Sequence, residues 1–437
     1  MITAAKKVYR ALRQYGFTAT LKKITYRLKS KFAGKNKTAN CPVTGLYGEF
    51  AEKYNSGEIC GIAIVPSAFE FDELYNQRTI NLAKYLSGKG YGVIYVAWQW
   101  HKAEAHEKSY QKVFRNVIQV PLYDFLDTFL QLKSFSEISN KKYIITLPAK
   151  AFYDLMFFIK ENCFDVYYDV MDDWERFHEA GQAPWYAGCI EEGVILNANR
   201  VSAVSEPLVQ KFSWLREDIM CVGNGYDPDR APPSVVTLTE RTDSNAPSTI
   251  DCNADEESAE GRTITVGYFG HLTDAWFDWQ LILETAEKHG NVFFEIIGYG
   301  ESAAIRKRVQ ASDNIQLIGK VEPEQLHKYA ERWHAAMIPF KKSELAAAVD
   351  PIKVYEYLYF GVPAVVTGIP HLSGFPYVEV VDNDSGLFYS AVERAYERKQ
   401  SGEIDHSVIS SFLADKTWEK RFDRVFETDF LSKLYEE

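Results

Sequence analysis

The sequence predicts two doubly wound α/β domains that face each other across a cleft. The 437 residues are too many for one ordinary core and enough for two domains of about 150 to 200 residues each. Short apolar strands alternate with helical stretches in two separate blocks, which is typical of parallel sheets. A polar break at 239–262, with seven acids, two arginines and few apolar residues, separates the blocks and indicates a flexible linker or surface insertion.

The two blocks place the expected elements. The first block has expected strands at 59–66, 92–96, 144–147, 166–169 and 200–204 and a helix at 78–88; the second has strands at 263–269, 292–297, 315–318, 335–339 and 364–367, a helix at 279–289 and helical residues at 407–437. The resulting division is a basic amphipathic arm (1–40), a first domain (41–235), a polar acidic linker or insertion (236–262), a second domain (263–400) and C-terminal helices (401–437) that cross back to the first domain. Ligands of such open sheets bind at the carboxyl ends of the strands, so both domains should present these ends to the cleft.

Composition excludes several classes of protein. Hydrophobic residues make up 46% and charged residues 25%, the balance of a globular protein in water. No run of about 18 apolar residues exists to span a membrane, and the N-terminus lacks the apolar core of a secretory signal. The six cysteines are scattered without a Cys-x-x-Cys pair, so we expect reduced thiols in a cytoplasmic protein, without a zinc site.

The charge is distributed unevenly. Residues 1–37 hold eleven basic residues and no acid. Setting those aside leaves 38 basic residues against 60 acidic ones, a net charge of −22 for the rest of the chain. An acidic body argues against nucleic acid as a partner. The arm has the pattern of a basic amphipathic helix, which fits either an anionic membrane surface or packing on the protein.

The segment 350–361 carries the most chemical information. Asp350 is a good N-cap, Pro351 suits the first helical position, and Gly361 suits the end of a helix. The N-terminus of such a helix binds pyrophosphate well, because its free N–H groups and its dipole face the anion. Lys353 would add a positive charge there, and Glu356, three residues later on the same face, could accept hydrogen bonds from ribose hydroxyls. The alternative is an ordinary amphipathic helix with a surface Lys–Glu pair.

Several motifs, in this order along the chain, resemble those of GT-B glycosyltransferases, especially the family-four-like enzymes that assemble bacterial surface polysaccharides. They are Q-R-x-x-N-L-A at 77–83, N-G-Y-D at 224–227, G-Y-F-G at 267–270 with W-F-D at 276–278, I-I-G-Y-G at 296–300 and P-x-K-x-x-E-Y-L-x-x-G at 351–361. The chain departs from the family at Ala348, where the first acid of a common acid pair would stand. It also lacks a basic pair in the loop 271–279, which leaves the donor sugar and the stereochemical course open.

The resemblance implies a donor site in the second domain. Lys353 would bind the pyrophosphate of a nucleotide sugar and Glu356 its ribose. The other residues implied for the donor are Gly270, His271, Gly298, Tyr299, Gly300, Asp350 and Tyr355. Stabilising the leaving diphosphate is the main chemical task, and the helix end and Lys353 can do so with neither metal nor other cofactor.

Candidate acceptor residues follow strands of the first domain. Asp172 or Asp173 could act as general base toward the acceptor hydroxyl, although one of them could merely cap the helix that follows. Ser205 could reach the cleft or could be an N-cap. His101 follows another strand and is a further candidate for the acceptor side, or a solvated loop histidine.

These observations predict a hexosyltransferase that moves a sugar from a nucleoside diphosphate sugar, by family frequency a UDP-hexose, to a glycan or lipid-linked glycan in O-antigen or capsule synthesis. We expect a cytoplasmic enzyme that the arm can hold peripherally at the inner membrane surface. Two alternatives remain: a GT-B-fold sugar nucleotide epimerase or phosphorylase, and a non-catalytic scaffold subunit of the same fold.

Overall fold

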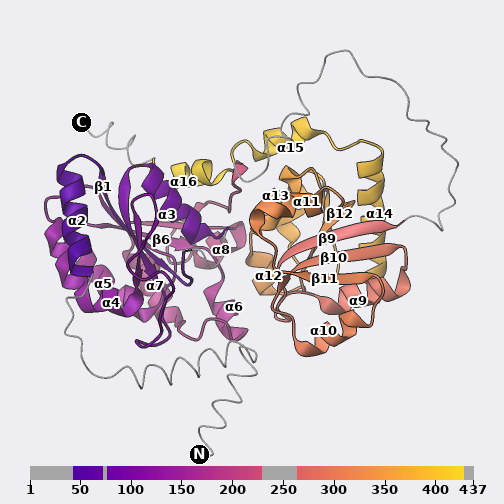
Figure 1. The fold of residues 1–437 in the computed structure, drawn as a ribbon, viewed down its shortest axis with the longest axis horizontal. Coiled ribbons are helices and arrows are strands. Elements are labelled where there is room, and N and C mark those ends of the chain that lie inside the picture. Colours follow the sequence, from indigo (N-terminus) through magenta and orange to yellow (C-terminus); the bar gives the residue numbers. More distant parts are fainter. Residues whose placement is uncertain (1–42, 72–75, 229–262, 428–437) are drawn as a thin grey trace, which may run out of the picture.

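Two α/β halves lie side by side, as Figure 1 shows. The computed structural model describes residues 43–71, 76–228 and 263–427. The predictions for the arm at 1–40, for the linker at 236–262 and for residues 428–437 therefore lie outside the described residues.

The first half is built on a sheet whose described strands run in the order β3-β4-β2-β1-β5-β6-β7-β8. They are β1 (Gly61–Ser67), β2 (Tyr91–Ala97), β3 (Lys112–Phe114), β4 (Val117–Pro121), β5 (Lys141–Ile145), β6 (Asp165–Val170), β7 (Arg200–Ala203) and β8 (Met220–Cys221). All neighbours pair in parallel except β3 and β4. β1, β2, β4 and β5 are buried along their whole length. This burial explains the mostly apolar runs of β1 and β2, whereas β4 and β5 also bury Gln119, Lys141 and Lys142.

Helices cover both faces of this sheet, which is why its central strands have no exposed face, whereas the edge strand β3 is largely exposed. They are α2 (Val43–Asn55), α3 (Arg78–Gly88), α4 (Leu122–Thr128), the 3-10 helix η1 (Phe129–Phe135), α5 (Lys150–Glu161), α6 (Trp174–Glu179), α7 (Gly188–Asn197) and α8 (Glu206–Phe212). One apolar cluster fills the side with α2, α4, α5 and α7, and a second, around α3, fills the other side. Such double covering is typical of a doubly wound fold.

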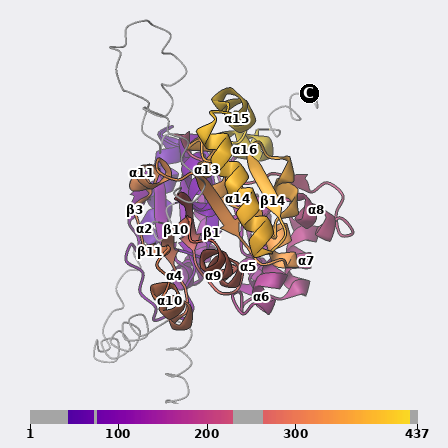
Figure 2. The ribbon, with the colours of Figure 1, turned by 90° about the vertical axis from the view of Figure 1, so that its right-hand side faces the viewer.

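The second half contains a parallel sheet with the described order β11-β10-β9-β12-β13-β14. Its strands are β9 (Ile264–His271), β10 (Val292–Tyr299), β11 (Ile315–Gly319), β12 (Ala335–Pro339), β13 (Ala364–Thr367) and β14 (Val378–Val381). Its helices are α9 (Trp279–Lys288), α10 (Ala303–Gln310), η5 (Pro323–Gln325), α11 (Leu326–Ala330), α12 (Glu344–Ala348), α13 (Ile352–Tyr359), η6 (Pro370–Gly374) and α14 (Ser385–Gln400). α14 lies on the outer side of this half and faces the viewer in Figure 2.

The chain then returns to the first half. After α15 (His406–Leu413), α16 (Trp418–Phe426) packs on α3. The rings of Tyr85 and Phe422 lie 5.4 Å apart, and Trp418 is buried in the same cluster. This returning helix ties the two halves together at one end of the cleft. Among the described residues, none of the helices combines the length and apolar character that crossing a membrane requires.

Candidate active site

The N-terminus of α13 meets the carboxyl end of β9 at Gly270. The φ of Gly270 is +147°, a backbone conformation that side chains rarely adopt. A Cβ atom on Gly270 would lie 3.0 Å from Cε and 3.3 Å from Nζ of Lys353. Glycine at this position therefore lets the Lys353 side chain lie directly over the strand end.

The Lys353 ammonium has no counter-ion within the described part of the chain, and it makes no hydrogen bond there. The centroids of the Tyr268 and Phe340 rings lie 5.4 and 5.5 Å from its Nζ atom. Burial lowers the pKa of Lys353 to about 8, and the charge of Glu356 partly opposes this shift. A desolvated cation of this kind favours an anionic ligand.

Glu356 faces the first half of the chain. Its carboxylate accepts a 2.7 Å hydrogen bond from Nδ2 of Asn76. Oδ1 of Asn76 in turn accepts from Asn81 at 2.8 Å and from the Trp418 indole at 3.1 Å. The structure thus holds Glu356 at the junction between α13, α3 and the returning helix α16.

The ends of β9 and β10 approach each other closely because both carry glycine. A Cβ on Gly298 would lie 1.8 Å from the carbonyl oxygen of Gly270, and one on Gly300 would lie 2.7 Å from Nε2 of His271. The His271 ring lies edge-on to Tyr299, with centroids 5.4 Å apart. Partial desolvation and the charge of Lys353 lower the pKa of His271. These predicted donor residues therefore lie together, beside Lys353.

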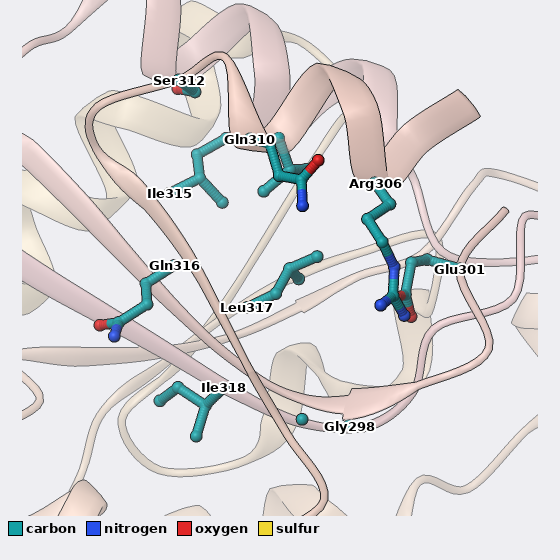
Figure 3. A pocket seen from close by; sticks show the side chains of 11 residues that line it. Gly298, Glu301, Arg306, Gln310, Ser312, Ile315, Gln316, Leu317 and Ile318 are labelled. Carbon is teal, nitrogen blue, oxygen red and sulfur yellow. The ribbon is translucent and has the colours of Figure 1, made fainter. Parts of the chain in front are cut away.

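A pocket of about 410 Å³ opens between α10 and β11, next to Gly298. Figure 3 shows its apolar floor and, at one side, the Glu301 carboxylate paired with Arg306. The lining residues are Gly298, Glu301, Arg306, Val309, Gln310, Ser312, Ile315, Gln316, Leu317, Ile318 and Gly319. Sequence reasoning missed Glu301, which directly follows the I-I-G-Y-G turn, and Arg306, which lies in the helix after it.

Asp350 does not cap α13, so that prediction was wrong. The N-cap position belongs to Pro351, and no side chain caps the helix. The Asp350 carboxylate, 6% exposed, accepts bonds from the backbone N–H of Asn224 at 2.5 Å and from the Tyr355 hydroxyl at 2.9 Å. Asp350 and Tyr355 thus lie in the connection between the halves, because a buried carboxylate goes where donors satisfy it.

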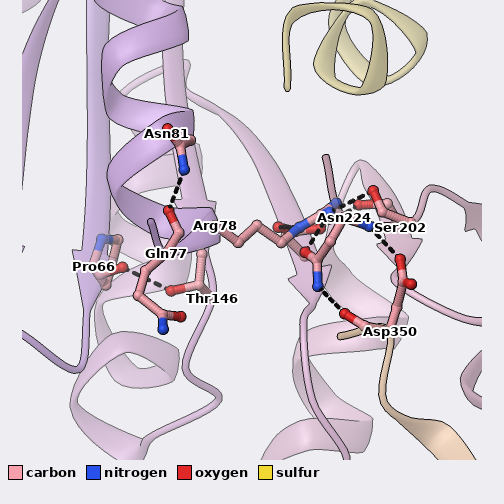
Figure 4. Close-up of polar contacts among 10 residues, drawn as sticks. Pro66, Gln77, Arg78, Asn81, Thr146, Ser202, Asn224 and Asp350 are labelled. Carbon is pink, nitrogen blue, oxygen red and sulfur yellow. Dashed lines mark hydrogen bonds and ion pairs between the residues drawn. The ribbon is translucent and has the colours of Figure 1, made fainter. Parts of the chain in front are cut away.

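Buried polar side chains complete this connection, and Figure 4 shows their arrangement. Arg78 forms two bonds to Asp169, at 2.6 and 2.9 Å, and a third to the Gly223 carbonyl at 3.0 Å. Arg421 of α16 donates to the Asn224 carbonyl at 3.0 Å. Sequence reasoning noted Arg78 only as part of a motif and missed Asp169 and Arg421. The available signal was a charged residue, Asp169, inside the otherwise uncharged stretch 166–170.

The two acidic candidates of the first half have different surroundings. Asp173 caps α6 by accepting from the Arg176 N–H at 3.1 Å and pairs with Lys211 at 2.6 Å, so the alternative of a helix cap is confirmed for this residue. Asp172 has neither a hydrogen bond nor an ion pair in the described structure. Burial, and next the charge of Asp173, raise its pKa to about 7, against the pull of Arg78.

Ser205 and His101 lie apart from these acids. Ser205 stands at the N-cap position of α8, but its hydroxyl does not cap the helix. It donates instead to the Ala348 carbonyl at 2.6 Å and so bridges the two halves. His101 lies in the turn after β2, and no contact in the described structure joins its side chain to Asp172 or Lys353.

A second pocket, of about 300 Å³, lies between the halves where Ala348 faces α6 and α8. Its lining residues are Asp173, Arg176, Pro207, Lys211, Glu344, Ala347 and Ala348. Within it Lys211 pairs with Asp173, and Arg176 pairs with Glu344. The position of the family's missing acid is therefore next to a space that both halves line.

Comparison with known proteins gives one relative in sequence and many in structure. No family model matches the chain. A Bacillus subtilis (strain 168) protein assigned to teichuronic acid biosynthesis as the glycosyltransferase TuaH is 28% identical over 125 residues. The match spans 28% of this chain and only 31% of that protein.

Three solved structures illustrate the similarity of fold. The apo form of the lipopolysaccharide outer core galactosyltransferase WaaB is 14% identical, with a TM-score of 0.54, over 84% of this chain and 99% of that one. Anabaena Alr3699/HepE, in complex with UDP and glucose, is 12% identical with a TM-score of 0.57, over 85% and 99%. A UDP-forming trehalose-phosphate synthase from Burkholderia vietnamiensis is 11% identical with a TM-score of 0.55, over 85% and 100%. The chain therefore has the GT-B glycosyltransferase fold, with two doubly wound domains that present their strand ends to a shared cleft.

Proposed function

We propose that the protein is a glycosyltransferase that moves a hexosyl residue from a UDP-hexose to a glycan or lipid-linked glycan during synthesis of a bacterial surface polysaccharide. The observation that carries the proposal is the ammonium of Lys353. It lies at the N-terminus of α13, over the strand end at Gly270, and has no counter-ion among the residues that the structure describes. A diphosphate is the ligand that such a desolvated cation and a helix N-terminus favour together.

This site stabilises the leaving group of the reaction, the diphosphate. When the bond between the anomeric carbon and the diphosphate oxygen breaks, negative charge grows on the diphosphate. Lys353 and the free N–H groups of α13 neutralise that charge, and the water-poor surroundings strengthen the interaction. We propose that the transfer needs no metal, because this chain's own groups supply the positive charge.

The acceptor side of the reaction requires a base. Burial raises the pKa of Asp172 to about 7, and its carboxylate has neither a hydrogen bond nor an ion pair to any described residue. A carboxylate with this pKa accepts the proton of an acceptor hydroxyl efficiently near neutral pH. We therefore assign the general base to Asp172, while Asp173 fixes the start of α6.

The relatives support the choice of donor and pathway. HepE of Anabaena was solved with UDP and with UDP-glucose, and the Bacillus subtilis relative is assigned to a surface polysaccharide. The eleven basic residues of 1–37 favour an anionic membrane surface, where a lipid-linked acceptor would be found. Flotation with anionic vesicles tests this part: the full chain should float, and a variant without residues 1–37 should not. Equal behaviour of the two proteins would exclude a role for the arm in membrane binding.

Thermal shift with UDP, GDP, dTDP and CMP tests the donor site. We expect UDP to stabilise the wild type and to have little effect on Lys353→Ala and Glu356→Ala. Lys342→Ala is the matched control, because Lys342 lies in the same half, is exposed and, among the described residues, forms its ion pair with Asp382 alone. No shift with any diphosphate would favour the non-catalytic scaffold. Consumption of UDP-glucose without an acceptor, or only with added phosphate, would favour the epimerase or the phosphorylase.

A further inference from the structure

Six aromatic side chains form a continuous run from the first half into the second. In order they are Trp100, Trp98, Trp185, Trp174, Phe177 and Trp276, and we call them the aromatic run. Successive ring centroids lie 5.9, 6.0, 5.1, 5.8 and 5.8 Å apart. The last of these contacts, between Phe177 of α6 and Trp276 after β9, joins the two halves.

The aromatic run begins at the strand ends of the first half. It leads from the region of the proposed base, Asp172, to the proposed donor site at Lys353. Trp98 follows β2, and Trp174 follows β6 and stands two residues after Asp172. At the other end, the Trp276 ring lies 5.7 Å from His271, which follows Gly270 beneath Lys353. A molecule lying along the aromatic run would therefore extend from the proposed base to the proposed donor site.

We propose that the half-buried and exposed rings of the aromatic run, which the buried ring of Trp174 (6% exposed) joins, form the binding surface for an acceptor made of several linked pyranose rings. This inference rests on the proposed function. Each pyranose has an apolar face of C–H groups that packs against an aromatic ring, and tryptophan offers the largest such ring together with an N–H donor. The spacing of the rings is comparable with the length of one sugar residue, so successive sugars can meet successive rings.

Two indole N–H groups distinguish a sugar chain from a lipid chain. Those of Trp98 and Trp174 are buried and have no acceptor among the described residues. A donor left in this state costs free energy unless a ligand or water accepts from it. Sugar hydroxyls and ring oxygens accept hydrogen bonds, whereas an alkyl chain does not. Trp100, 47% exposed at the outer end, offers a face to which the far end of the glycan can bind.

Binding of defined oligosaccharides tests the inference without knowledge of the natural acceptor. Saturation-transfer NMR on the full chain would use linear tetramers of glucose, galactose and N-acetylglucosamine, with undecyl phosphate as the lipid probe. We expect at least one tetramer to bind, and Trp100→Ala to weaken it at least tenfold. The control is Trp214→Ala, because Trp214 is 71% exposed and outside the aromatic run; it should bind like the wild type.

Three results would overturn the inference: binding of undecyl phosphate alone, binding of no tetramer, or equal losses in the two tryptophan variants. The donor site is measured separately, by UDP binding to the same samples. UDP binding without glycan binding refutes this inference and leaves the proposed function intact. If the wild type does not bind UDP, the proposed function itself is refuted, whatever the result for the glycan. Lys353→Ala should lose UDP and still bind the tetramer.

Discussion

The pH dependence of UDP binding follows from the state of Lys353. Its pKa in the free protein is about 8, and a bound diphosphate would raise it again, because the anion favours the charged form. If only the protonated amine binds, Kd rises by the factor 1 + 10^(pH − 8). Between pH 7 and pH 9 the affinity of the wild type should therefore fall about tenfold, or about 1.4 kcal/mol.

Isothermal titration calorimetry measures this effect in two ways. Kd at pH 7 and pH 9 gives the loss of affinity directly. At pH 8, titrations in two buffers of different ionisation enthalpy should report the uptake of about half a proton for each UDP bound. The matched variant is Lys353→Arg, whose guanidinium stays charged throughout this range and whose affinity should change far less. A wild-type Kd that moves less than threefold, or an equal change in the arginine variant, would refute the reasoning.

The same shift has a consequence for stability. The folded pKa of Lys353 lies below its ordinary value of 10.5. The free energy of unfolding is therefore reduced at every pH at which Lys353 is protonated in the unfolded chain, and we call this reduction the penalty. The penalty is complete below pH 8 and disappears as the pH rises from 8 to 10.5. Lys353→Met removes it, so the ligand-free variant should gain about 2 to 3 kcal/mol of unfolding free energy at pH 7. Thermal unfolding of the two proteins at pH 7 checks this expectation.

Four further predictions concern other parts of the molecule. Burial raises the pKa of Glu191 from 4.5 to about 7. The free energy of unfolding should therefore fall by about 3 kcal/mol as the pH rises from 4.5 to 7. In unfolding experiments, the free energy of Glu191→Gln should depend less on pH over this range. Asp172→Asn should lower the transfer rate about 100-fold or more and leave UDP affinity unchanged; a wild-type rate that does not rise through pH 7 would contradict the assignment. Transfer should continue in EDTA, and a rate restored only by Mg²⁺ or Mn²⁺ would disprove the metal-free mechanism. Gly267→Ala should destabilise by about 3 kcal/mol, because its Cβ would lie 1.8 Å from the Trp333 ring, whereas Gly290→Ala, with nothing within 4 Å, should unfold like the wild type.

The long, strongly apolar elements of the fold were predictable from sequence. The helix expected at 78–88 and the strands expected at 335–339 and 364–367 match α3, β12 and β13. β3, β4, β8 and β14 were missed: β3 and β8 have only three and two residues, and β4 and β14 carry polar residues within their runs. Their pairing comes from neighbouring strands, since an edge strand such as β14 is held by β13 and does not need an apolar run of its own.

The site shows a different limit of sequence reasoning. Spacing along one helix brought Lys353 and Glu356 together, because neighbours at three residues share a face. Spacing could not reveal that Asp350 bonds to Asn224, 126 residues away, or that Arg78 pairs with Asp169. A good capping residue is used elsewhere when tertiary structure supplies better donors, and for Asp350 the backbone of the connection between the halves does so.

Ala348 is the departure from the family that the structure makes understandable. Its side chain is buried beside the pocket between the halves, where Asp173 and Glu344 already supply two carboxylates and Lys211 and Arg176 balance them. A glutamate at 348 would add a third carboxylate to this set, on a residue position that is itself buried. Burying an unpaired charge is costly. Alanine avoids that cost, while its neighbours, contributed by both halves, place charge of both signs in the same pocket.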